Sequence, residues 1–206
     1  MSKPGLLLMG AGGHAKSCID VIEQEDKFRI IGLVGTRDEV GTHVLDYEVL
    51  GTDEVLSEFL NISQYALVAV GQIGTKDLRS KLFSKITNIG FLLPIVTSPM
   101  AYVSPHAVVG KGTVVMHRAT INAGSLIGDN CIINSHALIE HDVVVEDHCH
   151  IATGAIINGG STVGPSSFIG SGSTIRESIT IGRNCAVGMG VCVRHSLLPN
   201  SQFLGE

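Results

Sequence analysis

An aliphatic residue recurs at every sixth position over nearly half of this chain. From Val103 to Val193, in steps of six, all sixteen positions hold valine or isoleucine. A fixed short period of this kind is the signature of a repeat architecture. Most of these residues are followed four positions later by a small side chain, and many are followed directly by glycine. Residues 103–198 therefore form one repetitive segment.

The six-residue period predicts a parallel β-helix. Each hexad makes a short strand and a tight turn, and three hexads close one triangular coil. The aliphatic side chain points into the prism, and the small side chain packs near a corner, where a bulkier one would not fit. Because each coil buries its apolar face only against the next coil, the coils must stack. Cys131 and Cys149 stand eighteen residues apart in the small positions, so we expect both to be packing residues of one corner.

The first half of the chain lacks this repeat and alternates between strand and helix patterns, which predicts a small α/β domain with a parallel sheet. We expect this domain at residues 1–96 and a β-helix domain at residues 97–206. The expected strands cover 5–10, 29–35, 65–71 and 91–96, and the expected helices cover 14–26, 53–60 and 75–86.

Charge and composition limit the kinds of partner and the cellular location that we expect. The net charge is −5 without a basic run, which argues against a nucleic-acid partner. No apolar run approaches the roughly 20 residues that cross a bilayer, and the N-terminal segment has the pattern of a strand and turn, not of a signal peptide. Five cysteines without disulfide-type spacing favour a reducing, cytoplasmic setting.

The first expected strand ends in a glycine-rich turn. Residues 10–15, GAGGHA, fit the G-x-G-x-x-G/A pattern that places a pyrophosphate at a helix N-terminus. The second strand ends at Gly35, Thr36 and Arg37, where an NAD site would want an acid for the ribose. The pattern thus favours a nucleotide phosphate other than NAD. A glycine turn that only packs the helix on the strand is the alternative.

Residues 133–150 hold four of the nine histidines, interleaved with acids. His141 and Asp142 fall where a hexad turns, so both side chains can point outward at one corner. Asp142 can accept a hydrogen bond from one ring nitrogen and leave the other as a general base. One coil further on, Gly159 and Gly160 leave room for an extended ligand. His136 and His148 are expected to face solvent or another subunit.

The combination of "GAGGHAK" after the first strand, "NSHALIEHD" and the hexapeptide repeat resembles one family. It is similar to the bacterial sugar acyltransferases that include nucleotide-linked amino-sugar N-acetyltransferases and sialic acid O-acetyltransferases. The resemblance covers nearly the whole chain. It implies a Rossmann-like α/β domain that binds the sugar acceptor and a left-handed β-helix that binds acetyl-CoA. It also implies a homotrimer with active sites between subunits.

The same resemblance implies roles for individual residues. His141 is the general base, and Asp142 orients it. Acceptor binding falls to Gly12, Gly13, His14, Thr36, Arg37 and Asn134. Cofactor binding falls to His150, Gly159, Gly160, Gly188 and Met189, and no metal is expected. The family often carries acids after the second strand to hold base and ribose; with Gly35 and Thr36 there, the choice between uridine and thymidine stays open.

The expected function is acetyl-CoA-dependent N-acetylation of a nucleotide-linked amino sugar, a 4-amino-4,6-dideoxy sugar destined for a surface glycan such as O-antigen. Sialic acid O-acetylation is the alternative. Two other classes of protein are further alternatives. A zinc lyase of the carbonic anhydrase type would use His136 and His141, but Met100 stands where that pattern wants a third histidine. A non-catalytic trimeric scaffold would need none of these residues.

Overall fold

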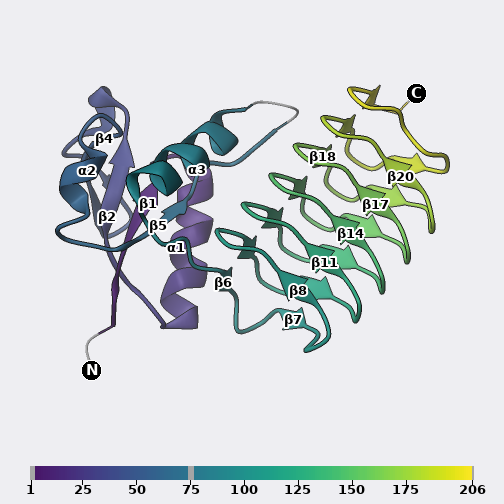
Figure 1. Ribbon diagram of the computed structural model, residues 1–206, viewed down its shortest axis with the longest axis horizontal. Coiled ribbons are helices and arrows are strands. Elements are labelled where there is room, and N and C mark those ends of the chain that lie inside the picture. The colour runs from purple at the N-terminus through teal and green to yellow at the C-terminus, as the bar shows by residue number, and fades with distance from the viewer. Residues whose placement is uncertain (1–2, 74–76, 206) are drawn as a thin grey trace.

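The computed structural model describes residues 3–73 and 77–205. Figure 1 shows an α/β domain beside the N-terminal end of a long stack of coils. This is the expected fold class, an α/β domain followed by a hexapeptide-repeat parallel β-helix. None of the helices in the described ranges has the length and apolar character that a membrane crossing demands.

The α/β domain is built on a five-stranded sheet in the order β3-β4-β2-β1-β5, parallel except for β3. Its strands are β1 (Gly5–Met9), β2 (Arg29–Gly35), β3 (His43–Val44), β4 (Tyr47–Thr52) and β5 (Tyr65–Val68). Its helices are α1 (Gly13–Glu25), the 3₁₀ turn η1 (Arg37–Glu39), α2 (Leu56–Phe59) and α3 (Leu78–Ile89). Strand β1, between β2 and β5, is apolar and buried on both sides because helices or the β-helix cover both faces of the sheet.

Two sequence expectations for this domain need correction. The segment 91–96 is not a strand: Leu92 makes only an isolated bridge to Tyr65, and β6 (Val96–Thr97) pairs with the β-helix instead. Pro94 interrupts this segment, and proline has no N–H to donate to a strand ladder. The hairpin of β3 and β4 was not expected. The start of the expected helix 75–86 lies outside the described residues, and α3 extends past its end.

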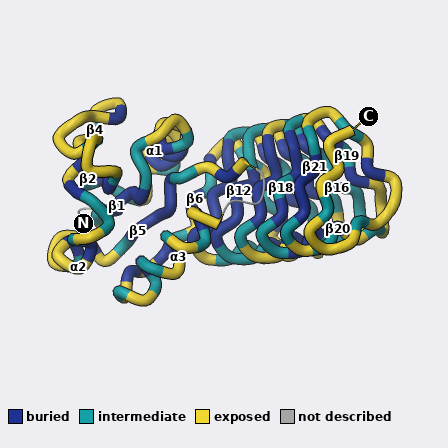
Figure 2. Tube along the Cα trace, turned by 90° about the horizontal axis from the view of Figure 1, so that it is seen from above, coloured by how far each residue is buried: buried dark blue, intermediate teal, exposed yellow. Residues whose placement is uncertain are grey.

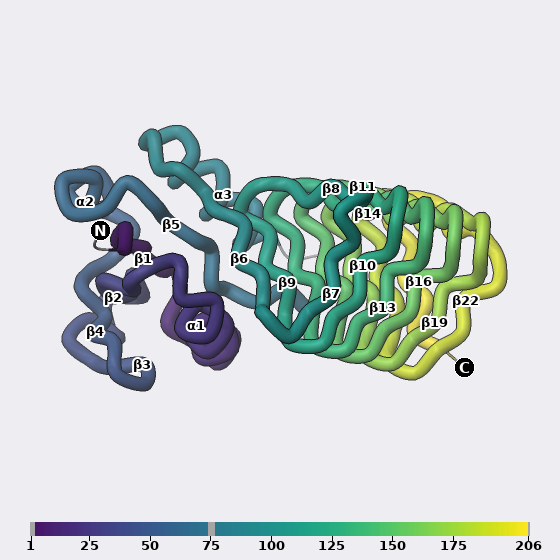
Figure 3. Tube along the Cα trace, turned by 90° about the horizontal axis from the view of Figure 1, so that it is seen from below, coloured from purple at the N-terminus to yellow at the C-terminus, as the bar shows by residue number. Residues whose placement is uncertain are grey.

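The β-helix is a triangular prism of two-residue strands with three flat sheets. The first face has the order β22-β19-β16-β13-β10-β7, the second β20-β17-β14-β11-β8, and the third β23-β21-β18-β15-β12-β9-β6. Figure 3 shows the first face from outside. The strands are β7 (Tyr102–Val103), β8 (Val108–Val109), β9 (Val114–Val115), β10 (Thr120–Ile121), β11 (Leu126–Ile127), β12 (Ile132–Ile133), β13 (Leu138–Ile139), β14 (Val144–Val145), β15 (His150–Ile151), β16 (Ile156–Ile157), β17 (Thr162–Val163), β18 (Phe168–Ile169), β19 (Thr174–Ile175), β20 (Thr180–Ile181), β21 (Ala186–Val187), β22 (Cys192–Val193) and β23 (Gln202–Phe203).

The prism interior follows the repeat. All sixteen aliphatic positions belong to one core cluster, and only Val103 and Val109, in the first coil, are partly exposed. Paired strands of neighbouring coils are eighteen residues apart, as in Ile133 with Ile151. In Figure 2 buried strand segments alternate with exposed turns along the prism. The second strand residue is thus the inward one, as the repeat predicts.

The corners explain the small residues. In each turn from Gly112 to Gly190, every sixth residue has a positive φ, including Asp142 at 59°. The following residue points inward and is buried at most of the small positions. Most serine and threonine hydroxyls there donate to a carbonyl of the next coil, as from Ser125 Oγ to Glu140 O at 2.6 Å. Cys131 and Cys149 are fully buried in one such corner, and burial raises the pKa of Cys149 well above its usual range.

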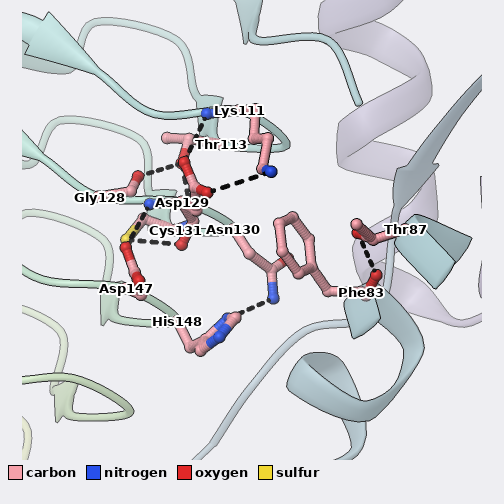
Figure 4. A network of polar contacts seen from close by, with 10 residues as sticks. All are labelled: Phe83, Thr87, Lys111, Thr113, Gly128, Asp129, Asn130, Cys131, Asp147 and His148. Carbon is pink, nitrogen blue, oxygen red and sulfur yellow. Dashed lines mark hydrogen bonds and ion pairs between the residues drawn. The ribbon is translucent and has the colours of Figure 1, made fainter. Parts of the chain in front are cut away.

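The two domains share a packed boundary on the third face. Val114 and Met116 of the prism belong to the same apolar cluster as α1 and the central sheet. Figure 4 shows Phe83 of α3 meeting the prism, its ring edge-on to His148 at 5.4 Å. Asn130 and His148 are joined by a 2.9 Å hydrogen bond on the prism side. The α/β domain is therefore held against the third face.

Candidate active site

A cleft of about 690 Å³ opens at the carboxyl ends of the parallel strands of the α/β domain. The strand order places a switch point between β1 and β5, and ligands of open α/β sheets bind outside such a point. Five of the six residues assigned to the acceptor line this cleft: Gly12, Gly13, His14, Thr36 and Arg37. The glycine turn and the end of β2 thus meet at one site.

The N-terminus of α1 faces this cleft uncovered. Gly12 is the N-cap residue and offers no side-chain cap, and the first turn carries no acid. A Cβ built on Gly12 or Gly13 would meet no atom within 4 Å. The free N–H groups and the positive end of the helix dipole form an anion site of the kind that binds phosphate.

His14 lies between this cleft and the prism. Its ring centroid lies 6.4 Å from that of His150 on β15. His150 Nδ1 donates to the backbone oxygen of Gln72 at 2.5 Å, and Asn134 Nδ2 donates to His150 Nε2 at 3.2 Å. These two partners define the neutral tautomer with its proton on Nδ1. The structure thus brings His14, His150 and Asn134 together at the domain boundary.

Both histidines are held neutral. Burial, and then the charge of Arg79, lower the pKa of His14 to about 3. Burial also lowers the pKa of His150 to about 4. The hydrogen bond to Gln72 acts in the opposite direction, and the charge of Arg79 lowers the pKa further. Neither ring is therefore a cation at neutral pH, and each can serve a substrate as a neutral hydrogen-bonding group.

Arg79 was not expected from the sequence. It is 1% exposed, and its guanidinium donates to the backbone oxygens of Val68, Val70 and Asn130 at 2.7, 2.8 and 3.2 Å. No carboxylate pairs with it in the described part of the chain. Burial lowers its pKa to about 10, so it stays charged. This cation ties the end of β5 to the prism and supports the loop that carries Gln72.

His141 and Asp142 lie at the corner between the first and second faces, which we call the His141 corner (residues 140–143 and their equivalents in other coils). His141 Nδ1 lies 2.9 Å from Asp142 Oδ2. Both side chains are exposed, 67% and 70%. This hydrogen bond raises the pKa of His141 above its usual value, and Glu140 adds to the effect. With its proton on Nδ1, the ring presents Nε2 as an unprotonated base.

Gly159 provides the floor under this ring. A Cβ at Gly159 would stand 2.7 Å from both Cε1 and Nε2 of His141. One coil before Asp142, a Cβ at Gly124 would stand 2.4 Å from Oδ1 of Asp142. The imidazole and the carboxylate therefore each lie over a glycine. Gly160, with φ of 69°, is the turn residue beside this floor.

Gly188 and Met189 lie at another corner, between the third and first faces. We call it the Asn134 corner, because Gly188 is three coils along the same column as Asn134. The column runs from Asn134 through Ala152 and Gly170 to Gly188, so its side chains become minimal along the prism. Met189 is 77% exposed. Four of the assigned cofactor residues thus divide between the two corners, and the fifth, His150, lies on β15 of the third face.

Within one subunit these groups do not meet. The His141 corner is opposite the third face, on which His150 and the α/β domain lie. The base candidate and the acceptor cleft are therefore on opposite sides of the prism. A site that used both would therefore have to combine groups from more than one copy of the chain.

This architecture defines a class: a hexapeptide-repeat acyltransferase with an added α/β domain. The model of the PglD N-terminal domain matches residues 5–86, and that of the bacterial transferase hexapeptide (six repeats) matches residues 106–141, 124–159 and 160–195. A comparison with curated proteins finds no match.

Solved structures agree over the full length. PerB from Caulobacter crescentus, in complex with CoA and GDP-perosamine, is 33% identical over 99% of this chain and 95% of that chain, with a TM-score of 0.91. A histidine-to-asparagine variant of perosamine N-acetyltransferase from the same organism, with the same ligands, is 32% identical over 99% and 95%, with a TM-score of 0.92. The acetyltransferase domain of PglB from Neisseria gonorrhoeae, in complex with acetyl coenzyme A, is 29% identical over 99% and 97%, with a TM-score of 0.90.

The chain therefore belongs to the bacterial hexapeptide-repeat sugar acyltransferase family, and it is an acyltransferase. The resemblance drawn from the glycine turn, the histidine segment and the repeat is confirmed at the level of the family.

Proposed function

We propose that this protein is an acetyl-CoA-dependent N-acetyltransferase whose acceptor is a nucleotide-linked amino sugar. The observation that best supports this function is that one chain holds two features. One is the uncovered N-terminus of α1 in the cleft, and the other is the hydrogen-bonded pair of His141 and Asp142 next to Gly159. The first suits a sugar diphosphate, and the second suits proton removal from an amine. Family members of the same architecture bind CoA or acetyl-CoA.

The acceptor would lie with its diphosphate on the N-terminus of α1, next to Gly12 and Gly13. From there the sugar would extend past His14 toward His150 and Asn134. Those two neutral side chains would orient the sugar through hydrogen bonds, which a cationic histidine could not do in the same way. In line with the family resemblance, we place the reactive amine at C4 of a 4,6-dideoxy sugar used for a surface glycan.

The reaction moves one proton, through His141, from the amine to the departing thiolate, and it needs no covalent enzyme intermediate. The neutral amine attacks the thioester carbonyl, which forms the C–N bond and an oxyanion. His141 Nε2 takes the proton that the amine loses, while Asp142 accepts from Nδ1 and stabilises the imidazolium. The intermediate then collapses, the C–S bond breaks, and the imidazolium can protonate the departing CoA thiolate. Within the described residues the N–H of Gly159 donates no hydrogen bond, so it is free to meet the oxyanion.

The subunit arrangement follows from the separation of the two corners. We propose a homotrimer in which the His141 corner of one subunit faces the acceptor cleft of the next. Acetyl-CoA would extend between adjacent prisms, along the minimal side chains that lead from Asn134 to Gly188. The five cysteines are all unpaired, and four are buried, which agrees with a reducing cytoplasmic setting.

The test is an acetyl-transfer assay that follows CoA release. The panel contains GDP-, UDP- and dTDP-linked 4-amino-4,6-dideoxy sugars together with free sialic acid. We expect turnover with at least one nucleotide-linked amino sugar and the product to be an amide by mass spectrometry. Turnover with sialic acid alone would instead establish the O-acetyltransferase alternative. If no acceptor in the panel leads to release of CoA, the proposed class of acceptor, a nucleotide-linked amino sugar, is contradicted.

The pH dependence should report the His141–Asp142 pair. The base must be neutral, so kcat/KM should fall as the pH drops below the raised pKa of His141. Asp142→Asn removes the charge that stabilises the imidazolium, so the pKa of His141 should fall. The acidic limb of the kcat/KM profile should then move to lower pH, and the plateau should also drop because the ring is less well oriented. A profile between pH 5 and 9 with an unmoved acidic limb would argue against this pair.

A further inference from the structure

The end of β2 presents a problem for nucleotide recognition. In α/β nucleotide-binding domains an acid at this point holds the ribose hydroxyls, while the N-terminus of the first helix holds the phosphates. Here the strand ends at Gly35, and Thr36 follows it as the N-cap residue of η1. The helix site is present, but no acid stands at the position where the sequence pattern wants one.

The structure fills that position from a different residue. The 3₁₀ turn η1 brings Glu39 back to the strand end, where its Oε2 accepts from the Thr36 N–H at 2.8 Å and from Thr36 Oγ1 at 2.9 Å. A Cβ at Gly35 would stand only 2.7 Å from this same oxygen. The Glu39 carboxylate therefore occupies the space that a side chain on residue 35 would take.

This carboxylate also has acceptor capacity left. A carboxylate offers about four lone-pair sites, and Thr36 uses two of them, both on Oε2. No cation pairs with Glu39 among the described residues, whereas the other two acids lining the cleft are paired: Glu54 with Arg37 and Asp53 with Lys85. Glu39 is thus the acid of this cleft with an oxygen, Oε1, open to a ligand.

We propose that Glu39 binds the 2′- and 3′-hydroxyls of the acceptor nucleotide, and that the acceptor is therefore a ribonucleoside diphosphate sugar, not a deoxythymidine one. The proposal rests on the proposed function, because it takes the cleft as the nucleotide site. Thr36 holds the carboxylate through its N–H and its hydroxyl, and Gly35 leaves free the space that the carboxylate occupies.

The test compares nucleotides that differ only in the ribose hydroxyls. GDP and UDP are each titrated against the 2′,3′-dideoxy form of the same nucleotide by calorimetry. The wild type should bind the preferred ribonucleotide about tenfold or more tightly than its dideoxy form, as charge-assisted hydrogen bonds predict. Glu39→Gln keeps an oxygen for Thr36, since Glu and Gln both complete a capping box, but it loses the charge. This variant should bind both forms with nearly equal affinity.

Glu54→Gln is the matched control, because it alters another acid lining the same cleft. It should retain the wild-type preference for the ribonucleotide. Unchanged discrimination in Glu39→Gln, or none in the wild type, would overturn the proposal while leaving the nucleotide site intact. A wild type that binds neither GDP nor UDP would overturn the nucleotide site itself, and this proposal with it.

Discussion

Replacing His141 with alanine should lower kcat by about 10²–10⁴-fold, the usual contribution of a positioned general base. The ring is 67% exposed at its corner and belongs to no core cluster, so its loss should leave the prism intact. Its Nδ1 is committed to Asp142, which leaves Nε2 as the group that can take a proton from the acceptor. The rate is measured as CoA release with the true acceptor at saturating acetyl-CoA.

His43→Ala is the matched control for this experiment. His43 is also an exposed histidine, but it lies on strand β3 of the α/β domain and does not line the cleft. We expect its replacement to leave kcat within about twofold, as for a surface substitution away from the chemistry. Both variants should show the same oligomeric state and melting temperature as the wild type. A near-normal rate in His141→Ala would refute the assignment of the base.

Replacing Gly159 with leucine should abolish most acetyl-CoA binding and lower turnover by about 100-fold or more, since small displacements of a catalytic group can cost that much. The reason is the space that the glycine leaves. Its Cβ alone would come within 2.7 Å of Nε2 of His141, so the ring must move. The leucine side chain would then fill the groove in which the thioester is expected. Calorimetry with CoA and the transfer assay measure the two effects separately.

Glu177→Leu tests whether the effect is specific. Glu177 stands one coil further along the same column and is exposed, so this corner accepts a large side chain there without loss of the fold. Both leucine variants should unfold at temperatures close to that of the wild type. An unchanged affinity for CoA in Gly159→Leu would show that the groove is somewhere else on the prism.

The sequence was most informative where local geometry repeats. A two-residue strand and a turn recur every six residues, so the inward positions could be assigned from the alternation of Ile and Val with small residues. All sixteen aliphatic positions lie in one core cluster. The glycine turn at 10–13 was equally readable, because a strand, a turn and a helix N-terminus are consecutive in the chain. His141 and Asp142 are neighbours in sequence, so their contact also needed no long-range information.

Other parts of the site depend on contacts between distant segments. Arg79 has the pattern of an ordinary helix residue, yet it is buried because α3 packs against the third face of the prism. Glu39 lies four residues after Gly35, and only the 3₁₀ turn shows that its carboxylate reaches the strand end. The sequence shows no acid at residues 35 and 36, and the folded chain places the Glu39 carboxylate beside them.

The sequence by itself determined the two-domain fold, the phase of the repeat and the family, because each depends on short-range periodicity or on consecutive residues. Only the tertiary structure decided which corner of the prism each histidine occupies relative to the α/β domain. That relation depends on which face the α/β domain covers, and the packing of Val114 and Met116 against α1 settles it. It places His141 on the far side of the prism from the cleft, and the proposal of a site shared between subunits follows from that separation.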